Sequence, residues 1–454
     1  MSRFLAKTKT EADGSGDDFA SIAEQRPGQL IETKNSFDPA TSTVLLSDEE
    51  STLDNLGQVA AALTEVKPSG APSAFETTVT PVSSDSETSK THSRLDPISG
   101  RWTIFAVSRV DRPSGFVNVP LGENASFACP FCSGNELDTP TAVLEIRPHE
   151  CEALAIDAVE RRPEPGVYGH NWAIRVIPNK YPAVEASIEV CGDSAVNREA
   201  QAVDRSGSLF MRRPISGGHE VFVESPDHRQ SLETLDLSHA TMVFHAYQLR
   251  MRHWRNVSSI RYVSLFKNLG PAAGASLHHS HSQLIATSEM PIAAKAVAAR
   301  MKHHWAKTGC CLQCDTIRAE IKAKQRLVAS TRSMVAYCPF GSHLPRLLRI
   351  TTRRHLECFE DLTMDELGEL VRLVRRSIHW LQAIYPDVAY NYLIQTRPPG
   401  ISSDEMAHWS LEIFPRVTQV AGFEWSSDCM INPILPEDAA ATFRELAMSE
   451  NPLR

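Results

Sequence analysis

The chain has 454 residues, a formal net charge of −9 and 42% hydrophobic side chains. At roughly 100–200 residues per domain, this length predicts two or three domains with a sizeable core. The first 92 residues hold 15 of the 55 acidic side chains but only 7 of the 46 basic ones, so the remainder is close to neutral. A near-neutral folded part argues against a nucleic-acid partner, because binding to a phosphate backbone needs a basic face.

The sequence also argues against a membrane partner and against secretion. No run approaches the 18 apolar residues that a membrane-spanning helix needs. The opening residues lack the apolar segment of a secretory signal. We therefore expect a cytoplasmic location.

Residues 1–92 are rich in Ser, Thr, Asp, Glu and Pro and contain no Trp, Tyr or Cys. Such a segment cannot bury enough apolar surface to offset its ordering entropy. We predict a disordered acidic tail, in which residues 53–66 have the pattern of a transient amphipathic helix.

After the tail, the predicted elements follow one another in an order that occurs twice. The first set has strands at 101–107, 171–179 and 219–225, a helix at 236–256 that Asp236 or Ser238 caps, strands at 261–268 and 283–289, and a helix at 291–306. The second set has a strand at 344–352, a helix at 365–385, and strands at 390–396 and 408–415. This internal repeat predicts an α+β fold with two tandem lobes, at residues 93–290 and 291–454.

Each lobe contains a possible zinc site. In the first lobe the candidate ligands are Cys129, Cys132, His228 and His279. The CxxC pair alone is equally compatible with ordinary buried thiols, but the two histidines complete the four ligands of a tetrahedral zinc site.

In the second lobe, Cys311 and Cys314 form the CxxC pair and His408 aligns with His279. The fourth ligand is Cys358 or His355. Cys358 lies 50 residues before His408, nearly matching the 51 residues between His228 and His279. Cys310 could replace Cys311, although the spacing would then be CxxxC. The alternative here is that these are core thiols.

The segment 268–286 carries most of the functional signal. Gly270, Gly274 and Ser276 form a turn of small residues, where backbone N–H groups can approach an anion. Since residues i and i+2 of a strand share a face, His281 and Gln283 lie on the same side.

This arrangement favours nucleophilic catalysis on a phosphate. A neutral His281 can attack phosphorus, and Gln283 can donate to phosphoryl oxygens without adding negative charge. We expect a backbone carbonyl to fix the His281 tautomer. If the histidines only bound metal, the turn and Gln283 would have no role.

These residues resemble the galactose-1-phosphate uridylyltransferase family of the histidine-triad superfamily, over residues 95 to about 449. The resemblance rests on CPFCSGNELDTP, IRVIPNKYPAVE, ESPDH and FKNLGPAAGASLHHSHSQ, in this order. It implies two histidine-triad-like lobes, each an antiparallel sheet with helices, and His281 as a nucleophile that becomes nucleotidylated beside Gln283. The implied substrate contacts are Arg109, Arg112, Asn179, Asn268, Gly274 and Ser276.

The resemblance also implies a reaction and its partners. A nucleoside-diphosphate sugar transfers its nucleotide to His281, and a sugar 1-phosphate or phosphate then accepts it. UDP-glucose with galactose 1-phosphate is the family's commonest pair, so we predict uridylyl transfer between these two, with adenylyl transfer from ADP-glucose to inorganic phosphate as the alternative. The relatives suggest a homodimer with two zinc ions per chain, the second held by Cys311, Cys314, Cys358 and His408.

Two departures from the usual motifs bear on this expectation. The triad reads HSHSQ, a form similar to plant ADP-glucose phosphorylases, in which inorganic phosphate is the acceptor. The second lobe has Ser410 where the first has His281, so we expect only the first lobe to be catalytic. A nucleotide hydrolase and a zinc-stabilised binding protein are further alternatives, but the second would not need His281 and Gln283.

Overall fold

The computed structural model describes residues 91–109, 129–148, 172–185, 215–228, 230–401 and 407–449. The predicted tail up to residue 90, the helix predicted at 53–66 and Arg112 lie outside these residues. No helix in the described ranges has both the length and the apolar character needed to cross a membrane.

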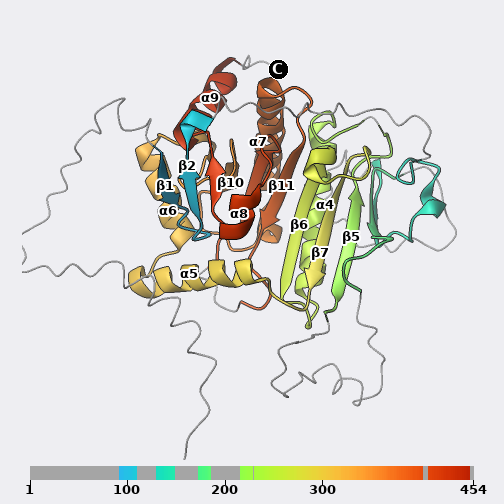
Figure 1. The fold of residues 1–454 in the computed structure, drawn as a ribbon. Coiled ribbons are helices and arrows are strands. Elements are labelled where there is room, and N and C mark those ends of the chain that lie inside the picture. The colour runs from blue at the N-terminus through green and yellow to red at the C-terminus, as the bar shows by residue number, and fades with distance from the viewer. Residues whose placement is uncertain are drawn as a thin grey trace, which may run out of the picture. The chain divides into compact units, whose positions relative to one another are not determined.

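Ten strands form one sheet in the order β3-β4-β5-β7-β6-β11-β12-β10-β9-β8, and every neighbouring pair is antiparallel (Figure 1). Five strands come from the first lobe: β3 (Leu144–Ile146), β4 (Ile174–Pro178), β5 (Gly217–Val223), β6 (Tyr262–Leu269) and β7 (His281–Thr287). Five come from the second: β8 (Leu327–Ser330), β9 (Met334–Tyr337), β10 (Leu348–Thr352), β11 (Tyr390–Gln395) and β12 (Ser410–Pro415).

The sheet order confirms the internal repeat. Reading inward from either edge gives the same succession, with β3 to β7 matched by β8 to β12. The two halves meet where β6 pairs with β11, for example Phe266 with Leu393. The predicted α+β fold with two antiparallel lobes is therefore correct, and the lobes share one continuous sheet.

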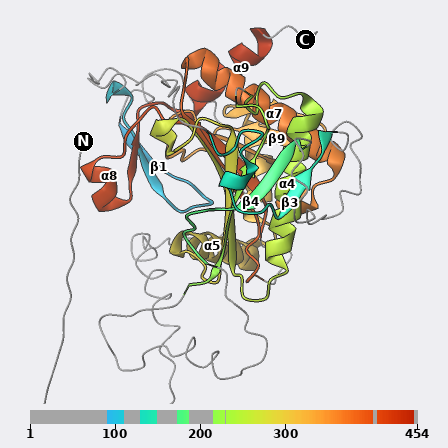
Figure 2. The ribbon, with the colours of Figure 1, turned by 90° about the vertical axis from the view of Figure 1, so that its right-hand side faces the viewer.

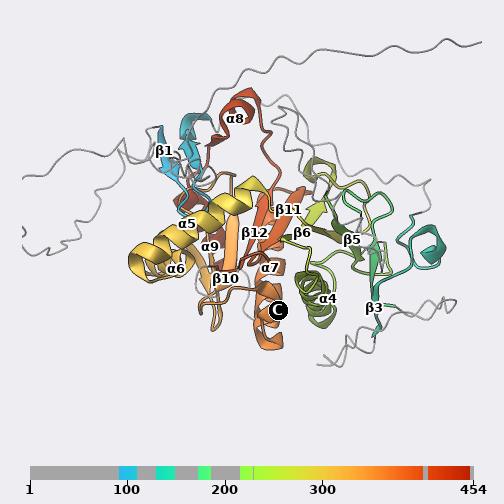
Figure 3. The same ribbon diagram turned by 90° about the horizontal axis from the view of Figure 1, so that it is seen from below.

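Two equivalent helices cover one face of this sheet. They are α4 (Leu237–Arg255) and α7 (Met364–Ile384), which pack against each other (Figure 3). Asp236 caps α4 by accepting from the His239 N–H, and Thr363 with Glu366 forms a capping box on α7. Their buried side chains join those of the strands in the main core.

The opposite face carries the first described strands of the chain. Figure 2 shows β1 (His92–Leu95) and α8 (Gly422–Ser427) on the side of the sheet away from α4 and α7. β2 (Trp102–Phe105) pairs with β1 and, in parallel, with β13 (Met430–Asn432). These N-terminal strands thus contact the second lobe, although the predicted boundary at residue 93 assigns them to the first.

Helices α5 (Ile292–Thr308) and α6 (Leu312–Ala323) connect the lobes, and α9 (Pro436–Ser449) ends the described chain. The described residues also contain four short 3-10 helices: η1 (Val107–Arg109), η2 (Glu136–Asp138), η3 (Pro271–Ala273) and η4 (Phe359–Asp361).

Candidate active site and metal centres

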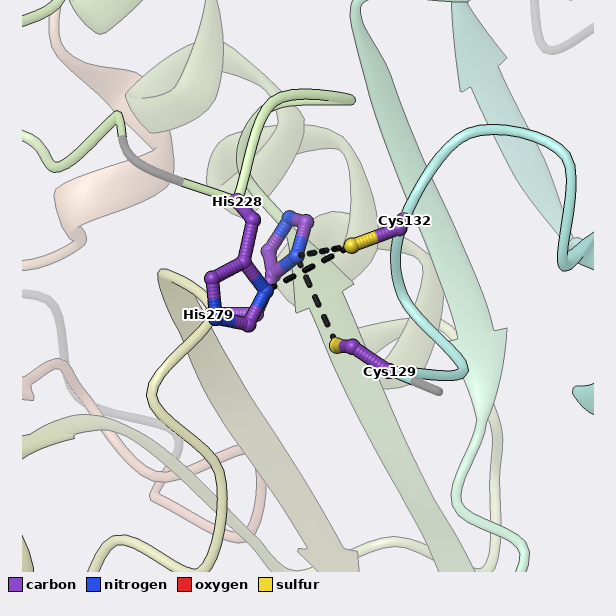
Figure 4. A group of neighbouring side chains, drawn as sticks. All are labelled: Cys129, Cys132, His228 and His279. Atoms are coloured by element: carbon purple, nitrogen blue, oxygen red, sulfur yellow. Dashed lines mark hydrogen bonds between the residues drawn. The ribbon is translucent and has the colours of Figure 1, made fainter. Parts of the chain in front are cut away.

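Cys129, Cys132, His228 and His279 come together in the first lobe (Figure 4). Their four ligand atoms all lie within 4.8 Å of one another. The Nδ1 atom of His279 is 3.7 Å from the Cys129 sulfur and 3.6 Å from the Cys132 sulfur. Its other ring nitrogen donates to the Ser225 carbonyl at 2.7 Å, so Nδ1 is left unprotonated toward the thiols.

The cysteine loop is built to present both sulfurs. The Cys132 N–H donates to the Cys129 carbonyl, and Gly134 adopts a φ of 96°, which side chains other than glycine rarely tolerate. Phe131, between the two cysteines, packs edge-on against His281 with ring centroids 5.4 Å apart. The loop therefore connects the Cys2His2 group to His281, the predicted nucleophile.

His281 is buried at the start of β7, and its tautomer is fixed. Its Nδ1 atom lies 2.7 Å from the carbonyl of His279 and must be protonated to donate there. Nε2 then carries the lone pair. Burial lowers the pKa of the imidazole, which keeps it neutral near pH 7.

Behind β7, a buried polar network holds the alternate residues of the strand. The carboxylate of Glu224 accepts from Lys267 at 2.5 Å, from Ser280 at 2.6 Å and from the hydroxyl of Ser282. Lys267 also donates to the carbonyl of His281 at 3.2 Å. These contacts explain both serines of HSHSQ, because each satisfies the same buried carboxylate.

The network also determines which side chains of β7 point toward α4 and which point to the opposite face of the sheet. Tyr247 of α4 bonds with Glu224 at 2.9 Å and lies 2.7 Å from the Ser282 hydroxyl. Since Ser282 points toward α4, His281 and Gln283 point toward the opposite face. Glu224 and Lys267 were not predicted from the sequence; the available signal was a pair of serines on the buried side of a strand.

Neutral amides surround this face. The Oδ1 atom of Asn268 accepts from Asn391 at 2.8 Å, and the amide nitrogen of Asn268 lies beside Gly274. Gly274 has a φ of 90°, as the small-residue turn requires. Gln283 lies 2.8 Å from His219, and Asn179 lies 3.1 Å from the same His219 nitrogen. His219 is a further residue that sequence reasoning missed.

Two residues predicted to contact substrate, Ser276 and Arg109, have exposed side chains. Ser276 is exposed in the turn before β7, and Arg109 is exposed at the end of η1. Their contact with substrate stays a prediction, as does that of Arg112.

The second group contains Cys311, Cys314, His355 and His408. Both histidine Nδ1 atoms lie 3.4 Å from the Cys314 sulfur. The expected fourth member, Cys358, is corrected to His355. His355 lies in the loop after β10, as His228 lies in the loop after β5, and its ligand atom is within the group, whereas Cys358 is buried at the start of η4 and is not a member of it.

The second lobe has other residues at the positions of the predicted catalytic pair. Ser410 and Glu412 begin β12 at the positions of His281 and Gln283 on β7. Glu412 is buried and accepts from Arg349 at 2.6 Å, and Arg349 also lies 3.3 Å from Asp96. A paired carboxylate thus replaces the neutral amide, and the Ser410 hydroxyl replaces the imidazole of His281.

Known proteins share this architecture. The family model for DUF4921, a domain of unknown function, matches residues 213–448. The ADP-glucose phosphorylase of Arabidopsis thaliana is 30% identical over 366 residues, which cover 78% of this chain and 93% of that protein. The chain belongs to the galactose-1-phosphate uridylyltransferase family. It also belongs to the family that the DUF4921 model describes.

Further relatives agree with this assignment. A galactose-1-phosphate uridylyltransferase of Thermotoga maritima is 23% identical over 361 residues, covering 78% of this chain and 97% of that protein. A crystal structure of the Arabidopsis ADP-glucose phosphorylase with bound ADP-glucose has a TM-score of 0.62 at 28% identity, covering 78% of this chain and 99% of that one. A uridylyltransferase structure, at 22% identity and a TM-score of 0.56, shares the fold. The chain is therefore an enzyme of the nucleotidyltransferase type within this family.

Proposed function

We propose that this enzyme transfers a nucleoside monophosphate from a nucleoside-diphosphate hexose to a phosphate acceptor through a nucleotidyl-His281 intermediate. The observation that carries the proposal is the bond from His281 Nδ1 to the carbonyl of His279, at 2.7 Å. It leaves Nε2 as an unprotonated nucleophile on the face that also presents Gln283.

The reaction has two displacements at the same phosphorus. His281 Nε2 attacks the α-phosphorus of the donor, the bond from that phosphorus to the bridging oxygen breaks, and hexose 1-phosphate leaves with the electron pair. An acceptor phosphate oxygen then attacks the α-phosphorus, and the P–N bond breaks. The amide hydrogens of Gln283 and Asn268 stabilise the negative charge on the phosphoryl oxygens.

ADP-glucose is the proposed donor, and inorganic phosphate is the proposed acceptor. The support is the 30% identity with an ADP-glucose phosphorylase over 93% of its length, together with the HSHSQ form of the triad. The second candidate pair is UDP-glucose with galactose 1-phosphate. It is supported by the match to 97% of a uridylyltransferase at lower identity.

We further propose zinc as the ion for both Cys2His2 groups. Two thiolates and two neutral imidazoles form the donor set that tetrahedral zinc prefers, and His279 already presents Nδ1 to the thiols. Zinc would hold the Cys129 loop and the start of β7 together, which fixes Phe131 against His281.

Intact-protein mass spectrometry tests the proposal. The full chain is incubated briefly with ADP-glucose or UDP-glucose, alongside His281→Ala and the matched second-lobe variant Ser410→Ala. We expect one adenylyl group per chain from ADP-glucose in the wild type and in Ser410→Ala, none in His281→Ala, and discharge by inorganic phosphate. A uridylyl adduct that only galactose 1-phosphate discharges would instead select the second candidate. If neither donor labels His281, the covalent mechanism with these donors fails.

A further inference from the structure

His219, on β5, lies beside the amides of Gln283 and of Asn179, a predicted substrate contact, and has no assigned role. Its Nε2 atom lies 2.8 Å from Oε1 of Gln283 and 3.1 Å from the amide nitrogen of Asn179. Its Nδ1 atom lies 3.1 Å from the backbone nitrogen of Ala183.

The backbone contact decides the tautomer. The Ala183 N–H can only donate, so the Nδ1 atom of His219 must be an unprotonated acceptor. The ring proton of the neutral imidazole is then on Nε2. Burial lowers the pKa of His219, which favours this neutral form near pH 7.

The tautomer in turn decides how Gln283 is turned. Because Nε2 carries the proton, it donates to Gln283, and Gln283 must present its oxygen. The NH2 group of Gln283 therefore faces away from His219. Within the described part of the chain, it has no other acceptor.

Two neighbouring amides are fixed in the same way, each through a backbone group. The Tyr181 N–H donates to Oδ1 of Asn179 at 2.8 Å, so the NH2 group of Asn179 is the end of the amide that faces His219 Nε2. These are two donors, so no hydrogen bond forms between them and the Asn179 amide hydrogens stay available. Asn391 donates to the Ala273 carbonyl at 3.0 Å, and the same nitrogen donates to Oδ1 of Asn268.

Gln283, Asn179 and Asn268 thus each have the amide oxygen held within the protein, and each has an NH2 group that can donate to a ligand. This orientation suits a phosphate, because every group that remains is a donor and none carries a charge. Only for Gln283 is the orientation set by a titratable side chain.

We propose that His219 is a positioning residue that turns the NH2 group of Gln283 toward the transferred phosphate. This inference rests on the proposed nucleotidyl transfer through His281. It assigns His219 no contact with the substrate; its effect passes through Gln283.

Two substitutions separate this role from a merely structural one. A glutamine side chain places its NH2 near the position of Nε2, and an asparagine places its oxygen near that of Nδ1. His219→Gln keeps the donor to Gln283, whereas His219→Asn keeps only the acceptor for Ala183. We expect adenylylation of His281 within about threefold of wild type in His219→Gln and about 10- to 100-fold slower in His219→Asn.

A purely structural role at Ala183 predicts the reverse order and would overturn the proposal. In a Gln283→Ala background, His219→Asn should change the rate less than about twofold, because its effect requires Gln283. A full additional loss there would also overturn it. His245, another part-buried histidine that contacts a glutamine amide 3.1 Å away, gives the matched control, and His245→Asn should leave the rate unchanged.

A spectroscopic measurement keeps this inference distinguishable from the proposed function. In the full chain labelled with 15N-histidine, the His219 signals are assigned by their loss in His219→Asn. We expect the Nε2–H tautomer at pH 7. An Nδ1–H or doubly protonated ring would refute the orientation of Gln283 even if His281 is labelled normally. If no donor labels wild-type His281, the proposed function fails and the catalytic role of His219 fails with it, while the Nε2–H signal still decides the tautomer.

Discussion

At the scale of single residues, the site depends on which atom of each histidine or amide side chain is not already hydrogen-bonded within the protein. His279 and His281 each donate one N–H to a backbone carbonyl, which leaves the other ring nitrogen for a metal or for phosphorus. The sequence predicted that His281 and Gln283 share a face, because strand geometry requires it. It could not predict His219, since that contact joins two strands distant in sequence.

The fourth member of the second Cys2His2 group shows the limit of counting residues. Matching the separation of 50 to that of 51 selected Cys358, but those intervals span a helix, a strand and a turn whose lengths differ between lobes. Counting within one loop, from equivalent paired residues of the preceding strands, is the better guide. Phe222 of β5 pairs with Ser282, and Ile350 of β10 pairs with the equivalent Leu411. His228 lies six residues after Phe222, whereas His355 lies five and Cys358 eight residues after Ile350, so this count points to His355.

Metal content tests this correction. We expect about two zinc ions per wild-type chain by elemental analysis, and about one in His355→Ala, because that variant loses a ligand of the second group. Cys358→Ser is the matched control and should retain two. Loss of an ion in Cys358→Ser, with none lost in His355→Ala, would restore the original choice.

At the scale of elements, predictability follows the strength of the periodic pattern. Helix α7 has a buried face along its whole length and was predicted to within a residue or so. Strand β9 (Met334–Tyr337) was not predicted, because all four of its residues are buried and no alternation appears. Helix α6 was also missed; its first turn carries Cys314 of the second group.

The strand β7 depends on a charge pair that its own sequence does not contain. Glu224 and Lys267 are fully buried against each other. We expect Glu224→Gln to lower the free energy of unfolding by about 3–5 kcal/mol, because it leaves the Lys267 ammonium buried without a counter-charge. Urea unfolding measures this loss. A change below about 1 kcal/mol would contradict it, and Glu224→Gln with Lys267→Met should recover part of the stability.

The same pair predicts how stability varies with pH. Burial alone would raise the pKa of Glu224, but Lys267 and the serine hydroxyls lower it below its ordinary value of 4.5. A carboxylate with a lowered pKa in the folded state stabilises the fold above the unfolded-state pKa, and this contribution is lost as the pH falls through the folded-state pKa. The difference in unfolding free energy between wild type and Glu224→Gln should therefore shrink below pH 4.5.

At the scale of the whole molecule, the two lobes share one strand order but differ in the side chains at the positions of His281 and Gln283. The repeat was visible in the order of elements, but the pairing of β6 with β11 was not, because nothing local specifies which edges meet. The position of β1 and β2 beside the second lobe is a similar long-range result. Asp96, just after β1, lies 3.3 Å from Arg349 of β10.

The difference between the lobes predicts that a single histidine will not create a second active site. Ser410→His restores an imidazole at the position of His281, but Glu412 stands where Gln283 is needed, and Arg349 holds its carboxylate. A carboxylate there repels phosphoryl oxygens, whereas an amide donates to them. We expect this variant to take up one nucleotide per chain by intact mass, as the wild type does.

The converse variant tests the same argument in the first lobe. Gln283→Glu places a carboxylate beside His281 and should slow adenylylation at least 100-fold, while His281 and its bond to the His279 carbonyl stay in place. Uptake of a second nucleotide by Ser410→His, or an unchanged rate in Gln283→Glu, would show that the amide is not what separates the two lobes. The distinction would then lie in the loops around each face rather than at this position.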